Sequence, residues 1–146
     1  MSHVSEASCY CGEIEFTVEN DLQGTTCQCR SCQKLCTDRS FNVSSTKEGV
    51  KVTKGTPKIF VDTKTDSGKA VHRAFCGNCG SALWSAPDLK PGVVFVKAGT
   101  LHDARDVKHV ASVYVESTIP SLKIGQGKDV KHFEGFGAKQ VDPLSM

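Results

Sequence analysis

Eight cysteines in closely spaced groups constrain this chain more than any other feature of its sequence. They stand at positions 9, 11, 27, 29, 32, 36, 76 and 79 of a 146-residue chain. The first six residues show no basic and apolar signal pattern, so a secreted disulfide framework is not expected. Grouped cysteines in a cytosolic protein more often bind a metal ion or carry out redox chemistry. We therefore predict metal binding and keep redox or disulfide chemistry as the alternative.

The segments "SCYCG" and "FCGNCG" each bring two sulfur atoms together. Cys9 and Cys11 are two residues apart, and alternate residues of a strand point to the same side. Cys76 and Cys79 have the CxxC spacing of a zinc knuckle, in which adjacent glycines permit a tight turn. Because structural zinc almost always has four ligands, the two pairs are predicted to form one closed site. A redox-active pair formed by Cys76 and Cys79 is the alternative.

The segment "CQCRSC" contains a second group, formed by Cys27, Cys29 and Cys32. Three thiolates on one zinc ion leave a fourth position open, which is the arrangement of a catalytic zinc. An open zinc can bind a substrate thiol as the thiolate, or polarise a carbonyl group. Cys36 follows at a spacing that would let it close the site and make it structural. Spacing alone leaves both possibilities open.

Positively charged side chains near this second group are candidate substrate contacts. Three thiolates and one Zn²⁺ ion carry a net negative charge, so a further anionic ligand needs positive charge nearby. Arg30 lies inside the group and Lys34 follows one helical turn later. We predict that these two residues bind the substrate, with Arg39 and His72 as further candidates. The alternative for each is a role as exposed surface, and no general base can be named.

The apolar pattern is mostly that of β-strands. In "GEIEFTVE", Ile14, Phe16 and Val18 alternate with polar residues. The segments "GVKVTKG", "KIFVD", "AVHRAF", "GVVFVKAG" and "HVASVYVES" indicate further strands, and only "RSCQKLC" suggests one or two helical turns. The sequence therefore predicts one mainly β domain over residues 1–146. Its core is expected to span about residues 8–136, with a flexible tail over residues 137–146.

Charge and composition argue against several classes of partner. The net charge is +2 and the lysines are scattered among acidic residues, so no basic stripe for nucleic acid is predicted. No apolar run approaches the roughly 18 residues that a membrane helix needs. We expect neither a nucleic acid nor a membrane partner. The expected compartment is the reducing cytoplasm, with the nucleus not excluded.

Four segments together resemble one known family. The segments "SCYCGEIEFTVE", "CQCRSC", "FCGNCGSALW" and "VKAGTLHD" are similar to the glutathione-dependent formaldehyde-activating enzyme (GFA) family, which includes the centromere protein V-like domains. The likeness runs from about Ser8 to Phe136 and includes the order and spacing of seven cysteines. It implies a zinc-binding β-tent of packed antiparallel sheets. It also implies a structural zinc on Cys9, Cys11, Cys76 and Cys79 and a catalytic zinc on Cys27, Cys29 and Cys32.

The resemblance further implies chemistry at a carbon–sulfur bond. The family's founding activity joins formaldehyde and glutathione reversibly into S-hydroxymethylglutathione, and many relatives are regarded as carbon–sulfur lyases. This chain departs from the family's pattern at "QKLCTDRSF", at Gln28, where relatives often have His, and near Leu122, where an aromatic residue is missing. These departures leave the cysteine ligands unchanged but alter the residues expected to line the pocket. Formaldehyde itself is therefore not predicted as the substrate.

We therefore predict a zinc-dependent carbon–sulfur lyase or thiol–aldehyde adduct-forming enzyme. Its cofactors are two zinc ions per chain, the second of which need not be filled in every preparation. Its substrate is glutathione or a similar small thiol conjugate, and a homodimer is compatible with this prediction. The alternatives are a non-catalytic zinc module that binds a protein or chromatin partner, and a redox sensor whose central thiols form disulfides.

Overall fold

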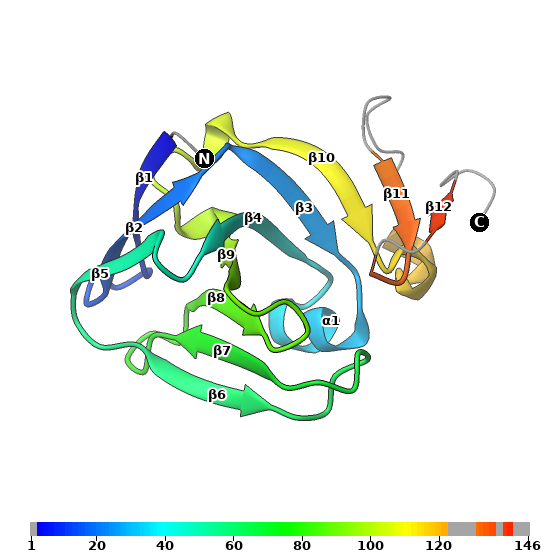
Figure 1. Cartoon of the computed structure of the whole chain (residues 1–146), viewed down its shortest axis with the longest axis horizontal. Coiled ribbons are helices and arrows are strands. Elements are labelled where there is room, and N and C mark those ends of the chain that lie inside the picture. The colour runs from blue at the N-terminus through cyan, green and yellow to red at the C-terminus, as the bar shows by residue number, and fades with distance from the viewer. Residues whose placement is uncertain (1–2, 123–130, 137–138, 142–146) are drawn as a thin grey trace. The chain divides into compact units, whose positions relative to one another are not determined.

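The computed structural model describes residues 3–122, 131–136 and 139–141, and it consists mostly of β-strands (Figure 1). The strands form two sheets, and one α-helix is present among the described residues, which confirms the predicted mainly β fold. The elements are β1 (His3–Ser8), β2 (Glu15–Asn20), β3 (Gln23–Cys27), α1 (Arg30–Cys36), β4 (Ser40–Thr46), β5 (Val50–Lys54), β6 (Lys58–Asp62), β7 (Val71–Phe75), β8 (Ala82–Pro87), β9 (Val93–Lys97), β10 (Lys108–Val113), β11 (Lys131–Glu134) and β12 (Lys139–Val141), with short 3-10 helices at Ala98–Thr100, Ala104–Asp106, Val115–Ser117 and Pro120–Leu122.

The chain folds into two compact units that each combine distant parts of the sequence. The first comprises Met1–Gln23 and Val43–Val107, and the second comprises Gly24–Asn42 and Lys108–Met146. The chain passes between the units within β3, within β4 and directly before β10. The four-cysteine group belongs to the first unit, and Cys27, Cys29 and Cys32 belong to the second.

The first unit contains a three-stranded antiparallel sheet and an antiparallel run of four strands. The three-stranded sheet has the order β1-β2-β5, and the run has the order β9-β8-β7-β6. On β2, Phe16 and Val18 are buried and alternate with less buried residues, as the period of two predicts. The Phe16 ring meets Trp84 edge to face with centroids 5.2 Å apart. Burial of a side chain such as Phe16 stabilises the fold by about 1.5–3 kcal/mol.

The second unit contains strands in the order β12-β11-β10-β3, together with α1. β10 and β11 run parallel, whereas β11 and β12 are antiparallel. The strand predicted over "HVASVYVES" ends at Val113, because Tyr114 adopts a left-handed backbone with φ of 55°. β12 lies within the segment 137–146 that the sequence predicts to be a flexible tail, whose residues 137–138 and 142–146 lie outside the described residues.

The helix α1 occupies the segment "RSCQKLC", where the sequence predicts one or two helical turns. Cys29 is its N-cap, and the Cys29 sulfur accepts a hydrogen bond from the backbone N–H of Cys32. This bond satisfies one of the amide groups that a helix leaves unpaired at its start. Within the described ranges, no helix is long and apolar enough to cross a membrane.

Candidate metal centres

Four cysteine sulfur atoms meet in the first unit, from Cys9, Cys11, Cys76 and Cys79. All four lie within 4.8 Å of one another. The Cys9 and Cys11 sulfurs are 3.5 Å apart, and those of Cys11 and Cys76 are 3.8 Å apart. Zinc–sulfur bonds of about 2.3 Å place the sulfurs of a tetrahedral site about 3.8 Å apart, whereas a disulfide bond is about 2.05 Å long. The observed spacing therefore fits four thiolates around one zinc ion and does not fit disulfides.

A tight turn after β7 presents Cys76 and Cys79. The Cys76 N–H donates to the Ser81 carbonyl and the Gly80 N–H donates to the Cys76 carbonyl, both at 2.9 Å. Gly80 has φ of +79°, a conformation that glycine adopts without steric cost. The Cys79 N–H points to the Cys76 sulfur at 3.5 Å. The local backbone therefore holds both sulfurs on the same side of the turn.

Hydrogen-bond donors reach the sulfurs of Cys9 and Cys11. The Ile14 N–H donates to the Cys9 sulfur at 3.3 Å, and the Asn78 amide donates to the Cys11 sulfur at 3.4 Å. Burial alone would raise the pKa of Cys9, but the Ile14 N–H and the neighbouring thiols outweigh it and lower that pKa. Since the thiolate is the form that binds a metal, these donors suit a metal centre.

Ser81 also lies beside the sulfur atoms, although nothing in the sequence pattern indicates it as part of the site. Its hydroxyl accepts a hydrogen bond from the Tyr10 N–H at 3.0 Å and lies 3.2 Å from the Cys79 sulfur. The hydroxyl proton is thus available to Cys79, because the N–H already occupies an acceptor position. Hydrogen bonds from the Ser81 side chain and backbone lower the pKa of the Cys79 thiol to about 5.

The second group of sulfur atoms belongs to Cys27, Cys29 and Cys32. These atoms also lie within 4.8 Å of one another. Cys27 ends β3, Cys29 caps α1, and Cys32 lies in the first turn of the helix. Hydrogen bonds with Cys29 and Cys32, together with burial, raise the pKa of the Cys27 thiol. The pKa of the Cys29 thiol is raised as well, so Cys27 and Cys29 resist losing their protons unless a cation offsets the charge. A thiol that coordinates a metal ion is deprotonated outright.

Two buried polar side chains keep this second group in place. The Ser40 hydroxyl donates to the Cys32 sulfur at 3.1 Å. The Gln33 amide donates to the Gln28 carbonyl at 2.8 Å and also to the Ser117 carbonyl. Both Ser40 and Gln33 are buried, although polar residues of these types are usually exposed. Single polar residues beside cysteines form no distinctive pattern, so the sequence does not indicate either residue as part of a site.

Cys36 does not belong to either group of sulfur atoms among the described residues. It is the last residue of α1, one helical turn beyond Cys32. The second group therefore offers three cysteine ligands, as a site with an open position requires. The assignment of these residues as catalytic ligands stays a prediction.

The predicted substrate contacts lie on or near α1. Arg30 and Lys34 are both exposed, and the Arg30 guanidinium donates to the Gln33 side-chain oxygen. Arg39 pairs with Asp38 at 2.6 Å, and His72 on β7 lies 3.1 Å from Asp88. Arg39 and His72 thus have acidic partners, and the predicted role of Arg30 and Lys34 as substrate contacts stays a prediction.

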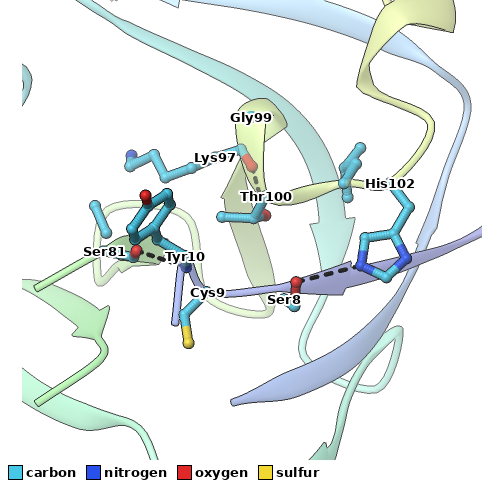
Figure 2. Close-up of a pocket in the computed structure, with 10 residues that line it drawn as sticks. Ser8, Cys9, Tyr10, Ser81, Lys97, Gly99, Thr100 and His102 are labelled. Carbon is cyan, nitrogen blue, oxygen red and sulfur yellow. Dashed lines mark hydrogen bonds between the residues drawn. The ribbon is translucent and has the colours of Figure 1, made fainter. Parts of the chain in front are cut away.

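A pocket of about 490 Å³ lies next to the four-cysteine group in the first unit (Figure 2). Several lining residues come from the segment "VKAGTLHD", one of the four segments that carry the family resemblance. The Thr100 hydroxyl donates to the Lys97 carbonyl at 2.7 Å, and the Ser8 hydroxyl lies 3.2 Å from the His102 ring. Tyr10 also lines the pocket and is 95% exposed. The described lining is Ser8, Cys9, Tyr10, Ser81, Ala82, Lys97, Gly99, Thr100, Leu101 and His102.

Comparison with known proteins establishes the family. A family model described as glutathione-dependent formaldehyde-activating enzyme matches residues 4–117, a range that includes every cysteine of the chain. The chain belongs to the GFA family. This confirms the resemblance seen in the cysteine-containing segments.

Structural comparison supports the fold of this GFA-family chain. A crystal structure of a Rhodobacter sphaeroides protein is similar to it, with a TM-score of 0.59 and 20% sequence identity. The similarity covers 73% of this chain and 98% of that protein. At this level of identity the likeness concerns the fold alone. No curated protein matches the chain.

Proposed function

We propose that this GFA-family protein is a zinc-dependent enzyme that forms or cleaves a carbon–sulfur bond in glutathione or a similar small thiol conjugate. The observation that carries the proposal is the group of three sulfurs from Cys27, Cys29 and Cys32, which lies at the start of α1 without a fourth cysteine. Three protein ligands are typical of catalytic zinc sites. Family membership supports glutathione as the thiol.

The protein residues around this group orient the ligands. A zinc ion bound there would act as a Lewis acid and would lower the pKa of a thiol that reaches the open position. The backbone N–H of Cys32 orients the Cys29 sulfur, and the Ser40 hydroxyl orients the Cys32 sulfur. These bonds keep two of the three ligands fixed when a substrate arrives.

Arg30 and Lys34 supply positive charge on the same helix. Glutathione carries two carboxylates, and exposed cations attract them from a distance of about one Debye length, roughly 8 Å at physiological salt. Arg30 is held by Gln33, so its position at the start of α1 is defined. We propose that these two residues bind the carboxylates while the thiol reaches the open position.

The four-cysteine group would bind a zinc ion that stabilises the fold. Four thiolates from Cys9, Cys11, Cys76 and Cys79 would fill all positions of a tetrahedral zinc, leaving none for a substrate. We therefore assign a structural zinc to this group. Because both groups need reduced thiols, the proposed compartment is the cytoplasm.

Cobalt substitution tests the proposed function directly. Cobalt replaces zinc in thiolate sites, and its absorption changes when a sulfur ligand displaces water. We expect glutathione to change the spectrum of the cobalt protein, and S-methylglutathione, which has no free thiol, to leave it unchanged. Cys29→Ser should abolish the response, because it removes one of the three ligands. A spectrum indifferent to glutathione and other small thiols would contradict the proposal and would support a non-catalytic zinc module.

A further inference from the structure

The members of the four-cysteine group differ in how far they are open to solvent. Cys9 and Cys76 are buried, and Cys79 is half-buried. Cys11 is exposed, and the preceding residue in the same turn, Tyr10, is 95% exposed. A molecule that approaches this group from solvent therefore meets the Cys11 side of it first.

The hydrogen-bond donors to these sulfurs differ as well. The sulfurs of Cys9, Cys76 and Cys79 each accept a hydrogen bond from a backbone N–H. Apart from the neighbouring thiols, the described residues offer the Cys11 sulfur one donor, the exposed Asn78 amide at 3.4 Å. Such an amide readily exchanges its partner for water, whereas a backbone N–H is fixed. Since hydrogen bonds stabilise a thiolate and weaken it as a nucleophile, Cys11 is the most nucleophilic member of the group.

Two lysines of the first unit lie beside this exposed side. The Lys54 ammonium donates to the Gly12 carbonyl at 3.0 Å, and Gly12 directly follows Cys11. The Lys58 stem lies against Gly77, because a Cβ at Gly77 would come within 2.7 Å of the Lys58 Cε. Reactive cysteines occur in such electropositive, partly exposed surroundings. Positive charge here would also attract an electrophile that carries a negative charge.

We propose that Cys11 is a modification site, at which a metal-bound thiolate attacks small carbon electrophiles and favours those that carry a carboxylate. A thiol that coordinates zinc is deprotonated outright, so Cys11 needs no separate base. Its sulfur donates an electron pair to form a carbon–sulfur bond, and the bond from that carbon to the leaving group breaks with both electrons on the leaving group. The products are a thioether at Cys11 and a free anion, such as iodide, and no oxidant takes part.

This modification would remove one ligand from the four-cysteine group. A thioether sulfur carries no negative charge and binds zinc more weakly than a thiolate does. The zinc assigned to this group would join Cys11 to Cys76, which is 65 positions away in the chain. Loss of that ion would destabilise the first unit, because binding free energy at a structural site is also folding free energy. Cys11 therefore makes the fold sensitive to electrophiles.

Limited alkylation of the full zinc-loaded chain with iodoacetamide tests the inference. Tandem mass spectrometry assigns the added mass to individual cysteines, so the result does not depend on the proposed enzymatic function. Cys11 should be modified at least about tenfold faster than Cys9, Cys76 or Cys79, because only Cys11 is exposed. In Cys29→Ser, which should retain only the zinc of the four-cysteine group, one zinc ion should be released to a chromophoric chelator for each Cys11 modified.

Variants near Cys11 test the role of its surroundings. Lys54→Met should lower the ratio of the iodoacetate rate to the iodoacetamide rate at Cys11 about threefold, because it removes a positive charge near the sulfur. Lys51→Met, at an exposed lysine of the same strand, is the matched control and should leave this ratio unchanged. Asn78→Ala should raise both rates about threefold, because it removes the hydrogen bond to the Cys11 sulfur.

Circular dichroism before alkylation would confirm that each variant is folded. Several results would overturn the inference. They are modification of a buried cysteine of the group as fast as Cys11, modification of Cys11 without release of zinc, equal rate ratios in the two lysine variants, and an Asn78→Ala chain that reacts no faster than wild type.

Discussion

The sulfur atoms of Cys11 and Cys76 lie 3.8 Å apart, although 65 positions separate the two residues in the chain. The distance matches the separation of about 3.8 Å expected between thiolates that share one tetrahedral zinc ion. The contact joins the segment after β1 to the turn after β7. A metal ion there would cross-link two distant parts of the first unit.

This relationship predicts unequal effects of removing ligands from the two groups. Cys76→Ser should leave the chain largely unfolded, because a structural zinc can contribute about 10–16 kcal/mol of apparent binding free energy to folding. Cys29→Ser should leave the chain folded and inactive. Circular dichroism and metal analysis would separate the two outcomes. Equal loss of folding in both variants would contradict the assignment of one structural and one catalytic site.

Removal of Cys36 tests whether the second group is open. Since Cys36 lies outside the group of three sulfurs, Cys36→Ala should retain two zinc ions per chain and change the thermal midpoint little. Cys32→Ala is the control within the same helix and should lose one zinc ion. Metal content measured after mild chelation decides the question. Loss of one zinc from Cys36→Ala would favour a closed, non-catalytic site.

Ser81→Ala should weaken metal retention in the four-cysteine group. The variant removes the hydroxyl that lies 3.2 Å from the Cys79 sulfur and lowers the pKa of that thiol. Loss of such a partner typically costs about 10–100-fold in metal affinity. Zinc release to a chromophoric chelator would measure the change. Ser67→Ala, in the exposed turn before β7, is the control and should release zinc as wild type does.

The roles of Arg30 and Lys34 can be separated from a purely structural role. Arg30→Ala should weaken the glutathione response of the cobalt protein at unchanged metal content, and Lys34→Ala should weaken it less. Arg30→Lys keeps the charge and should retain most of the response. Lys47→Ala removes an exposed charge in the first unit and should have no effect. If Arg30→Lys weakens the glutathione response as much as Arg30→Ala does, the response depends on the hydrogen bond from Arg30 to Gln33 and not on the positive charge.

Asp103 should make stability depend on pH. Burial alone would raise the pKa of its carboxyl group, but hydrogen bonds from His3 and Ser5 outweigh burial and lower it. Because this pKa is lower in the folded chain, the ionised carboxylate stabilises the fold fully above its unfolded pKa of about 3.9. This stabilisation is lost as the pH falls through the folded pKa. Asp103→Asn should therefore lower the free energy of unfolding by about 1–2 kcal/mol at pH 7.

Urea unfolding at several pH values would check this dependence. The difference between wild type and Asp103→Asn should begin to shrink as the pH falls below about 4, where the carboxyl group of the unfolded chain binds a proton, and should be lost below the lowered folded pKa. Asp66→Asn, in an exposed turn, should match wild type at every pH. A difference for Asp103→Asn that stays constant down to low pH would show that the carboxylate charge is not the cause.

The local features of this protein follow from its sequence. The CxC and CxxC spacings bring sulfurs together over two or three residues, although Cys9 and Cys11 lie in the turn after β1 and not on the strand that the sequence predicts. Alternation around Phe16 and Val18 predicts β2, and "RSCQKLC" predicts the position of α1. These features depend on neighbours in the chain, so the sequence alone is sufficient to predict them.

The tertiary structure decided the relationships between distant residues. It left Cys36 outside the group of three sulfurs and placed Ser81 beside Cys79. The meeting of Cys11 with Cys76 was already predicted, because structural zinc needs four ligands. The tertiary structure also made β10 and β11 parallel and left the apolar strand β6 at an exposed edge. Pairing of distant segments depends on how strands pack and on which order they take in a sheet. A spacing rule within a few residues carries no information about either, which is why only the folded chain shows them.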